Sequence, residues 1–288
     1  MSAGGPGDAA APAPAGRSPM SRPVTDLRNP VDVSGLRVLV TGAGSGIGRG
    51  IAQAFAERGA SVAVLDLDGE RGLDAAAALP PVSGAEPAHL FVLCDISEPA
   101  SVRRAVDVAL AAFGHIDVLV NNAGISAVKP FLDMDPGLPE WHRVIDVDLH
   151  GTAYVTHAVG NAMRSAGHGG LIVNISSVGG ATCSGSADMP MTGYVASKAA
   201  LNHLTRSWAI EFAEHGIRVN CIMPGPTRSG LDALLTPAMA ERNVRGMLDR
   251  RCGEPLEIGA LCVFMASPEG AHLDGVVVQH DGGFLCIN

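Results

Sequence analysis

LRVLVTGAGSGIG, at residues 36–48, joins an apolar run to a loop of four glycines. The apolar run suits a buried parallel strand. Residues 49–58 then carry apolar side chains at helical spacing, and Gly59 stops the pattern. Glycines on a strand-to-helix turn let the backbone turn tightly and let a pyrophosphate approach the helix N-terminus, where free N–H groups favour anions. The order of strand, loop and helix therefore predicts the start of a dinucleotide-binding α/β fold.

A carboxylate follows at the place that such a fold requires. Residues 61–65 form a second strand-like run, which ends at Asp66, 18 residues after Gly48. This is close to the spacing at which an acidic residue binds the ribose hydroxyls of a dinucleotide. A carboxylate there repels a 2′-phosphate, and neither Ser45 nor Leu67 offers a cation to attract one. NAD is therefore the cofactor that we expect, in preference to NADP.

Strand-like and helical segments alternate along the rest of the chain. The strand-like runs are 37–40, 61–65, 90–93, 117–120, 171–175, 217–222 and 275–279. This alternation predicts an α/β fold with a doubly wound parallel sheet, a Rossmann fold, in a single domain over residues 31–288. Residues 1–30 are rich in Ala, Gly and Pro and predict a disordered N-terminal tail. Translation from Met20 is an open alternative.

Composition argues against several other classes of protein. The formal net charge is −9 with no basic block, so we expect no nucleic-acid partner. No apolar run has the length of a membrane span. The six cysteines show no paired or metal-like spacing, which favours a reduced, cytoplasmic compartment. His142, His150 and His157 lack carboxylate or cysteine partners at ligand spacing, so no metal site is expected.

Tyr194 and Lys198 lie four residues apart, which places them on one face of a helix, one turn from each other. An unperturbed tyrosine is a poor acid or base at neutral pH, because its pKa is roughly 10. A fixed ammonium nearby favours the phenolate, as general acid–base catalysis at neutral pH requires. Upstream, the strand-like run 172–175 ends in Ser176 and Ser177. These residues together predict a site for proton transfer.

In their order along the chain, these motifs resemble those of the short-chain dehydrogenase/reductase family. The resemblance extends from about residue 34 to the C-terminus, and the ordered set is specific although each motif alone is weak. The motifs are Thr41-Gly42 with Gly46-Ile47-Gly48, Asp95-Ile96, Asn121-Asn122-Ala123-Gly124, Ser177, Tyr194 with Lys198, Pro224-Gly225, and Asp281-Gly282-Gly283. The resemblance implies a homotetramer, with the helices after Trp141 and around residues 194–212 in its interfaces.

The resemblance also implies roles for individual residues. Tyr194 would exchange a proton with the substrate, and Lys198 would assist it and bind the nicotinamide ribose. Ser177, rather than Ser176, would hold the substrate oxygen, and Asp148 completes the implied catalytic set. The implied cofactor-binding residues are Gly42, Ser45, Gly46, Ile47, Gly48, Asp66, Asp95, Ile96, Asn122, Tyr194, Lys198, Thr227 and Ser229.

Asp148 departs from the pattern, because the family usually has asparagine at this place in its proton relay. An ionised aspartate accepts hydrogen bonds but cannot donate them. It also adds negative charge near Lys198, which offsets part of the influence of the lysine on Tyr194. We expect the relay to survive with a shifted pH profile. The alternative is that Asp148 only caps or orients its helix.

Two segments near the implied substrate position leave alternatives open. Residues 179–193 make the Ser177–Tyr194 interval longer than usual, so Met189 and Met191 either contact substrate or belong to a surface excursion. Residues 231–251 resemble the mobile lid of the family. An apolar lid favours a hydrophobic alcohol or ketone, whereas helix packing explains the same side chains. These side chains are Leu231, Leu234, Leu235, Met239, Met247 and Leu248.

The predicted function is the NAD-dependent interconversion of a hydrophobic secondary alcohol and its ketone, with Tyr194 as general acid and base. A preference for NAD favours the oxidative direction. One alternative is a reductase of 3-oxoacyl or other carbonyl substrates. Another is a nucleotide-binding sensor of the same fold, which only the change at Asp148 supports. A Rossmann methyltransferase would share the glycine loop and the acidic residue but would not need the pair of Tyr194 and Lys198.

Overall fold

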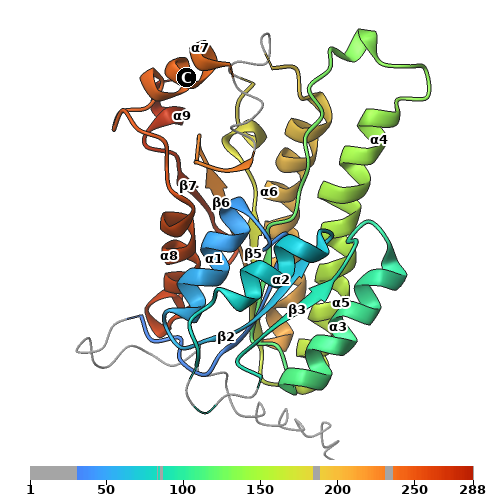
Figure 1. Ribbon diagram of the computed structural model, residues 1–288, viewed down its shortest axis with the longest axis vertical. Helices are drawn as coiled ribbons and strands as arrows, with labels where there is room; N and C mark the ends of the chain where they lie inside the picture. Colours follow the sequence, from blue (N-terminus) through green and yellow to red (C-terminus); the bar gives the residue numbers. More distant parts are fainter. Residues whose placement is uncertain (1–30, 83, 85–86, 184–188, 231–235, 288) are drawn as a thin grey trace, which may run out of the picture.

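Seven parallel strands form the centre of the molecule (Figure 1). The computed structural model describes residues 31–288 except 83, 85–86, 184–188, 231–235 and 288, so the expected tail over residues 1–30 lies outside the described residues. The strands lie in the order β3-β2-β1-β4-β5-β6-β7. They are β1 (Arg37–Thr41), β2 (Ser61–Asp66), β3 (His89–Leu93), β4 (Val118–Asn121), β5 (Gly170–Ile175), β6 (Ile217–Pro224) and β7 (Val277–His280).

The strands are apolar along their whole length because both faces of the sheet are covered. Val38 and Val40 of β1 belong to one buried cluster, whereas Leu39 between them belongs to the other. Successive side chains of a strand point to opposite faces, so an alternation between two cores requires a continuous apolar run. The prediction of a doubly wound parallel sheet is confirmed, and each predicted strand agrees with an observed one to within two residues at either end.

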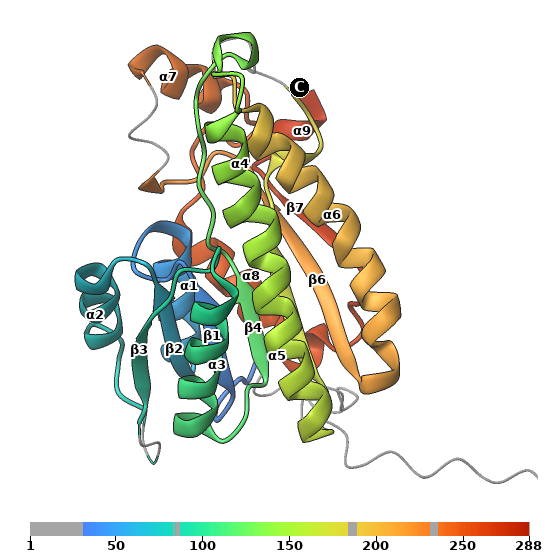
Figure 2. The same cartoon turned by 90° about the vertical axis from the view of Figure 1, so that its right-hand side faces the viewer.

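Helices cover the two faces of the sheet (Figures 1 and 2). One cluster is completed by α1 (Gly46–Ala56), α2 (Gly69–Ala77) and α8 (Pro255–Ala266). The other is completed by α3 (Pro99–Phe113), α5 (Thr152–Ala166) and α6 (Thr192–Phe212). Among the residues that the structure describes, every helix is too short or too polar to cross a membrane.

Several of the remaining helical segments stand near the carboxyl ends of the strands. A nearly continuous rod runs from α4 (Pro139–Ile145) through the π-helical segment η3 (Asp146–Gly151) into α5 (Figure 1). At the same end of the molecule lie α7 (Pro237–Arg245) and α9 (Phe284–Ile287). Because all strands are parallel, their carboxyl ends share one edge of the sheet, and the loops that follow them meet there.

Candidate active site

The glycine loop between β1 and α1 is closed against the end of β4. A Cβ on Gly48 would lie 2.2 Å from the carbonyl oxygen of Gly42 and 2.5 Å from Nδ2 of Asn122. Gly42 has a φ of +64°, in the left-handed region that favours glycine. The Asn122 amide donates to the carbonyl oxygens of Thr41 and Gly42, at 3.0 and 3.1 Å. Glycine is therefore required at both positions, at Gly48 because of its close contacts and at Gly42 because of its positive φ, and Asn122 fixes the loop.

The loop leaves the N-terminus of α1 able to bind an anion. Ser45 is the N-cap residue, and its side chain makes no capping hydrogen bond. The first N–H groups of a helix have no partner within the helix, and together with the helix dipole they favour a phosphate. These free N–H groups at the mouth of the glycine loop fit the pyrophosphate of a dinucleotide.

A long cleft runs along the carboxyl ends of β1 to β5. Eleven of the thirteen residues implied for cofactor binding line it. They are Gly42, Ser45, Gly46, Ile47, Asp66, Asp95, Ile96, Asn122, Tyr194, Lys198 and Ser229. Gly48 lies behind the loop against Asn122, and Thr227 lines a neighbouring pocket instead.

Asp66 is held at the end of β2 by backbone N–H groups. Its carboxylate accepts from Gly44 at 2.8 Å and from Asp68 at 3.0 Å. Arg71 also lines the cleft, and its Nε lies 3.2 Å from the Asp68 carboxylate. From the sequence, only Ser45 and Leu67 were considered as neighbours of Asp66, and Arg71 was missed. The first turn of α2 brings Arg71 into the cleft. The cleft thus holds both a carboxylate that repels a 2′-phosphate and a cation that attracts one.

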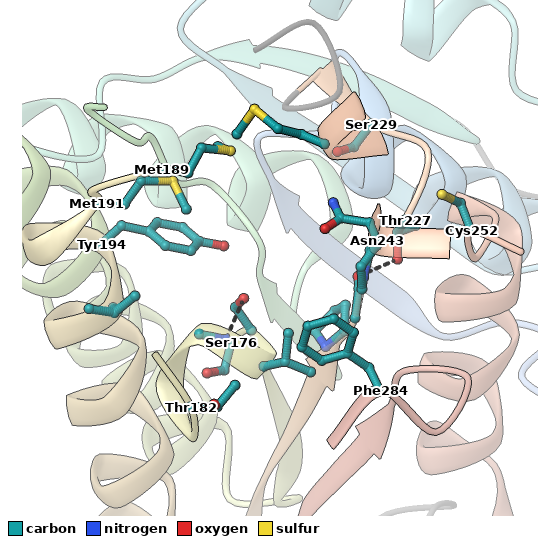
Figure 3. A pocket seen from close by; sticks show the side chains of 18 of the residues that line it. Ser176, Thr182, Met189, Met191, Tyr194, Thr227, Ser229, Asn243, Cys252 and Phe284 are labelled. Atoms are coloured by element: carbon teal, nitrogen blue, oxygen red, sulfur yellow. Dashed lines mark hydrogen bonds between the residues drawn. The ribbon is translucent and has the colours of Figure 1, made fainter. Parts of the chain in front are cut away.

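A second hollow, the apolar pocket, lies beside the long cleft (Figure 3). Met189 and Met191 line it before α6, Met239 lines it from α7, and Phe284 lines it from α9. Figure 3 shows the Tyr194 hydroxyl pointing into this pocket, with Phe284 on the opposite side. The two methionines therefore border the pocket, as one of the two sequence interpretations expects. Phe284 was missed, although it directly follows the Asp281-Gly282-Gly283 motif.

The contribution of α7 differs from the apolar lid that the sequence predicts. Besides Met239, the helix contributes Arg242 and Asn243 to the lining of the pocket. Pro at the start of α7 and the C-cap Gly246 confine it to nine residues. Beyond it, Met247 is buried and Leu248 is exposed, and neither lines the pocket. The predicted lid residues Leu231, Leu234 and Leu235 lie outside the described residues.

The two hollows meet at a shared wall. Four residues line both of them, namely Ile47, Ser176, Tyr194 and Ser229. Thr227, buried beside this wall, donates through Oγ1 to the carbonyl oxygen of Gly225 at 2.9 Å. The two hollows thus come closest to each other along this wall, which includes Tyr194.

The two serines at the end of β5 have different surroundings. Ser176 is buried, and its hydroxyl donates to the carbonyl oxygen of Lys198 at 3.0 Å. Ser177 lines the apolar pocket, and its Oγ accepts from the Gly179 N–H at 3.1 Å. As an acceptor in that bond, the Ser177 hydroxyl keeps its own proton for an oxygen in the pocket. The arrangement supports Ser177 as the residue that holds a substrate oxygen.

Lys198 is a buried ammonium beside the Tyr194 ring. Its Nζ lies 5.4 Å from the centre of the ring and donates to the carbonyl oxygen of Ile175 at 3.2 Å. Burial disfavours the ammonium, but nearby negative charge, chiefly that of Asp148, outweighs burial and raises the pKa of Lys198. Lys198 therefore remains a fixed positive charge next to Tyr194 at neutral pH.

Asp148 faces the site from the π-helical segment η3. Its Oδ1 accepts from the Ile125 N–H at 2.7 Å, and its Oδ2 lies 3.6 Å from Nζ of Lys198. The Ser197 hydroxyl donates to the same Oδ2 at 3.5 Å. Burial raises the pKa of Asp148 above its ordinary value, although Lys198 and the Ile125 amide oppose this. The Asp148 side chain does not cap its helix but joins the loop after β4 to Lys198, and π-helical turns are frequent at functional sites.

Known proteins match this chain over most of its length. Residues 42–285 match the family model described as enoyl-(acyl carrier protein) reductase. The chain is 39% identical over 254 residues to cis-4-hydroxycyclohexanecarboxylate dehydrogenase of Sinomonas cyclohexanicum. The match covers 86% of this chain and 96% of that protein.

Two solved structures are similar over most of the chain. A short-chain type dehydrogenase/reductase from Mycobacterium marinum has a TM-score of 0.82 and 35% identity, over 89% of this chain and 98% of that one. A 7α-hydroxysteroid dehydrogenase, in complex with NADH and 7-oxo glycochenodeoxycholic acid, has a TM-score of 0.79 and 30% identity, over 88% of this chain and 95% of that one.

Proposed function

This chain belongs to the short-chain dehydrogenase/reductase family, and we propose that it is an NAD-dependent oxidoreductase that interconverts a secondary alcohol and its ketone. One observation carries the proposal: the long cleft and the apolar pocket share a wall at Tyr194, with Lys198 behind it. A cleft that fits a dinucleotide and a pocket that suits an apolar substrate thus meet at a group able to exchange a proton.

The residues of the chain handle the proton of the reaction. When bound in the cleft, the nicotinamide supplies the hydride acceptor for alcohol oxidation. Ser177 donates a hydrogen bond to the substrate oxygen, and Tyr194 as phenolate takes the proton from that oxygen. The Lys198 ammonium stabilises the phenolate electrostatically, and Asp148 sets how strongly it does so. Carbonyl reduction uses the same groups with the proton passing from Tyr194 to the substrate.

The preference for NAD rests on Asp66. Its carboxylate is fixed by two backbone N–H groups, so it cannot turn away from a 2′-phosphate without losing both hydrogen bonds. Arg71 acts in the opposite direction, but it is paired with Asp68. Preference for NAD favours alcohol oxidation as the working direction.

The lining of the apolar pocket supports a substrate class. Met189, Met191 and Phe284 offer an adaptable apolar surface for a ring system, and Arg242 adds a positive charge to the lining. The compounds named for two of the similar proteins combine an alcohol or ketone with an acid group. We infer that the substrate is an alicyclic secondary alcohol or ketone that carries a carboxylate, which Arg242 would bind.

A homotetramer in the cytoplasm completes the proposal. Its interfaces would involve α4, α5 and α6, where Tyr154 and Ile210 expose 37% and 81% of their surface. Contiguous exposed apolar patches are typical of surfaces that associate, and in the proposed tetramer these two side chains would belong to such patches. Size-exclusion chromatography with light scattering tests the mass of the assembly.

The test follows NADH absorbance while the purified protein meets NAD and a panel of alicyclic alcohols with and without carboxylates. We expect turnover of at least one alcohol that carries a carboxylate. In Tyr194→Phe we expect kcat/KM for that alcohol to fall roughly 10²- to 10⁴-fold. Tyr154→Phe is the matched control, because Tyr154 is the other tyrosine of the chain and lies on the outer side of α5. Full activity in Tyr194→Phe would contradict the proposal.

The same experiment separates the alternative functions. Turnover of 3-oxoacyl compounds with NADH or NADPH, and none of alcohols, would favour the carbonyl reductase. Tight NADH binding without turnover of any compound would favour the sensor. Failure to bind NADH, in a protein that unfolds cooperatively on heating, would overturn the assignment of the cofactor.

A further inference from the structure

Three potential metal ligands gather where strands begin, at the edge of the sheet opposite to the long cleft. His115 and Asp117 lie between α3 and β4, and His168 lies between α5 and β5. Since β4 and β5 are parallel neighbours, their first residues lie side by side, near the ends of α3 and α5 (Figure 2). One nitrogen or oxygen atom from each of the three residues lies within 4.8 Å of the other two.

His168 has no hydrogen-bond partner for either ring nitrogen, although both nitrogens are buried. A buried polar atom without a partner costs free energy and calls for a specific explanation, of which a bound ion is one. On either side of His168, Gly167 and Gly169 both have φ above +70°, a conformation that favours glycine. The His168 ring packs edge-on against that of His115, with the ring centres 5.0 Å apart. The imidazole is thus held inside the cluster.

Asp117 brings a buried carboxylate to the same place. Its Oδ2 accepts from the Arg37 backbone N–H at 2.8 Å and lies 3.2 Å from Nε2 of His115. Among the described residues, no lysine or arginine forms an ion pair with it; the Arg37 guanidinium donates to the Gly35 carbonyl oxygen and lies over the Phe113 ring. Buried carboxylates are normally paired with a cation or bound to a metal. A divalent cation would supply the positive charge and also give His168 a partner.

We propose that His115, Asp117 and His168 bind a zinc ion, with water as the fourth ligand. Two imidazoles and a carboxylate suit zinc, whereas magnesium prefers oxygen ligands alone. In a tetrahedral zinc site with bonds of about 2.0–2.1 Å, ligand atoms lie about 3.3 Å apart. The pair of His115 and Asp117 already meets this spacing, and a movement of at most about 1.5 Å would bring His168 to it.

The role of this zinc is structural. It joins the turn between α3 and β4 to the turn between α5 and β5, whereas Tyr194 and the long cleft lie at the other edge of the sheet. The expectation that the protein has no metal site rested on His142, His150 and His157, which lack ligand partners nearby in the sequence. The proposed ligands come from two turns about fifty residues apart, and only the pairing of β4 with β5 brings them together.

Titration of the untagged, metal-free protein with zinc sulfate, followed by calorimetry and by thermal unfolding, tests the site. We expect one zinc per chain, and a rise in Tm on the order of 5 °C when free zinc is about a hundred times the Kd. His168→Ala should bind zinc at least about tenfold more weakly and lose most of that rise. His157→Ala, which removes an exposed histidine of α5, should behave as the wild type. Magnesium chloride should leave Tm unchanged.

His115→Ala keeps the test decisive if His168→Ala does not fold, because 42% of the His115 side chain is exposed. It too should weaken zinc binding by at least about tenfold. Absence of zinc binding by the wild type would overturn the proposal. Wild-type affinity in both histidine variants would also overturn it, and would place the ion elsewhere, for instance on the exposed Cys183 and Cys286.

Discussion

The long cleft and the apolar pocket adjoin each other but are built from different parts of the chain. The cleft is bounded by backbone: Gly44 binds the Asp66 carboxylate, and Asn122 binds the carbonyl oxygens of the glycine loop. The pocket is bounded by side chains from three separate segments, among them Met191, Met239 and Phe284. The comparison teaches that the cofactor position depends on fixed backbone geometry, whereas substrate choice depends on side chains that can be exchanged without changing the fold.

The largest effect is expected where the cleft is closed by backbone. In Gly48→Ala the new Cβ would lie 2.2 Å from the Gly42 carbonyl oxygen, and the displacement should cost roughly 1–3 kcal/mol or more. We therefore expect a lower Tm and NADH binding weaker by about tenfold to a hundredfold. Gly137→Ala is the matched control, because Gly137 is exposed, a Cβ on it meets nothing within 4 Å, and it does not line the cleft. Equal NADH affinity in the two variants would show that the glycine loop is not the rigid part of the site.

A smaller effect is expected when the charge at the adenosine end of the cleft is removed. Asp66→Asn deletes the carboxylate but leaves Arg71 in the cleft, so a 2′-phosphate should be tolerated better. We expect the ratio of kcat/KM for NADP to that for NAD to rise about tenfold. Asp74→Asn controls for net charge, since Asp74 lies on α2 and pairs with Arg49 on the surface. The same rise in the control would show that Asp66 has no specific part in the choice.

On the substrate side, Arg242→Met should change selectivity more than turnover. The KM for a carboxylate substrate is expected to rise about three- to fivefold, because an exposed charge pair contributes only about 1 kcal/mol. The KM for the corresponding neutral alcohol should stay the same. Arg245→Met is the control, since Arg245 pairs with Glu241 and does not line the pocket. A rise for both kinds of alcohol would instead indicate a disturbed α7.

The smallest expected change is a shift in the pH dependence of kcat/KM, which is set at Tyr194 in the wall between the two hollows. Oxidation needs the Tyr194 phenolate, so kcat/KM rises with pH until that group is ionised. The Asp148 carboxylate opposes the effect of the Lys198 ammonium on Tyr194. Its removal in Asp148→Asn should favour the phenolate as long as Lys198, which also donates to the Ile175 carbonyl oxygen, stays protonated. The midpoint of the rise should therefore move to lower pH by about half a unit to one unit. Asp146→Asn, with an exposed carboxylate in the same segment, should leave the midpoint in place because solvent screens it.

An unchanged midpoint in Asp148→Asn would support the view that Asp148 only orients its helix. A shift of the same size in Asp146→Asn would mean that net charge, and not the buried pair with Lys198, sets the profile.

Much of the cleft could be predicted from the sequence, because its requirements are local. Gly42 must adopt a positive φ, and Gly48 must lack a side chain. Asp66 follows β2 at a fixed spacing, and Tyr194 and Lys198 share one helical face. Each of these requirements restricts the residue type at its own position, so the pattern is visible in one dimension.

Less of the pocket could be predicted. Met189 and Met191 were found because they lie in a segment next to Tyr194, but Arg242, Asn243 and Phe284 were not. No local rule requires these residue types, since their selection depends on how α7 and α9 come to lie opposite α6 (Figures 1 and 3). The cation Arg71 was missed for the same reason. The turn of α2 places it in the cleft, and the residue types at Ser45 and Leu67 do not depend on that turn.

The sequence by itself determined the parallel α/β architecture, the glycine loop, the carboxylate after β2 and the pairing of Tyr194 with Lys198, because backbone dihedral angles and the period of a helix or strand act over a few residues. Only the tertiary structure decided that Asp148 contacts Lys198, that the two hollows share a wall, and that His115, Asp117 and His168 meet at the far edge of the sheet. These contacts join segments tens of residues apart, and the order of the strands in the sheet, not the order of residues in the chain, brings them together.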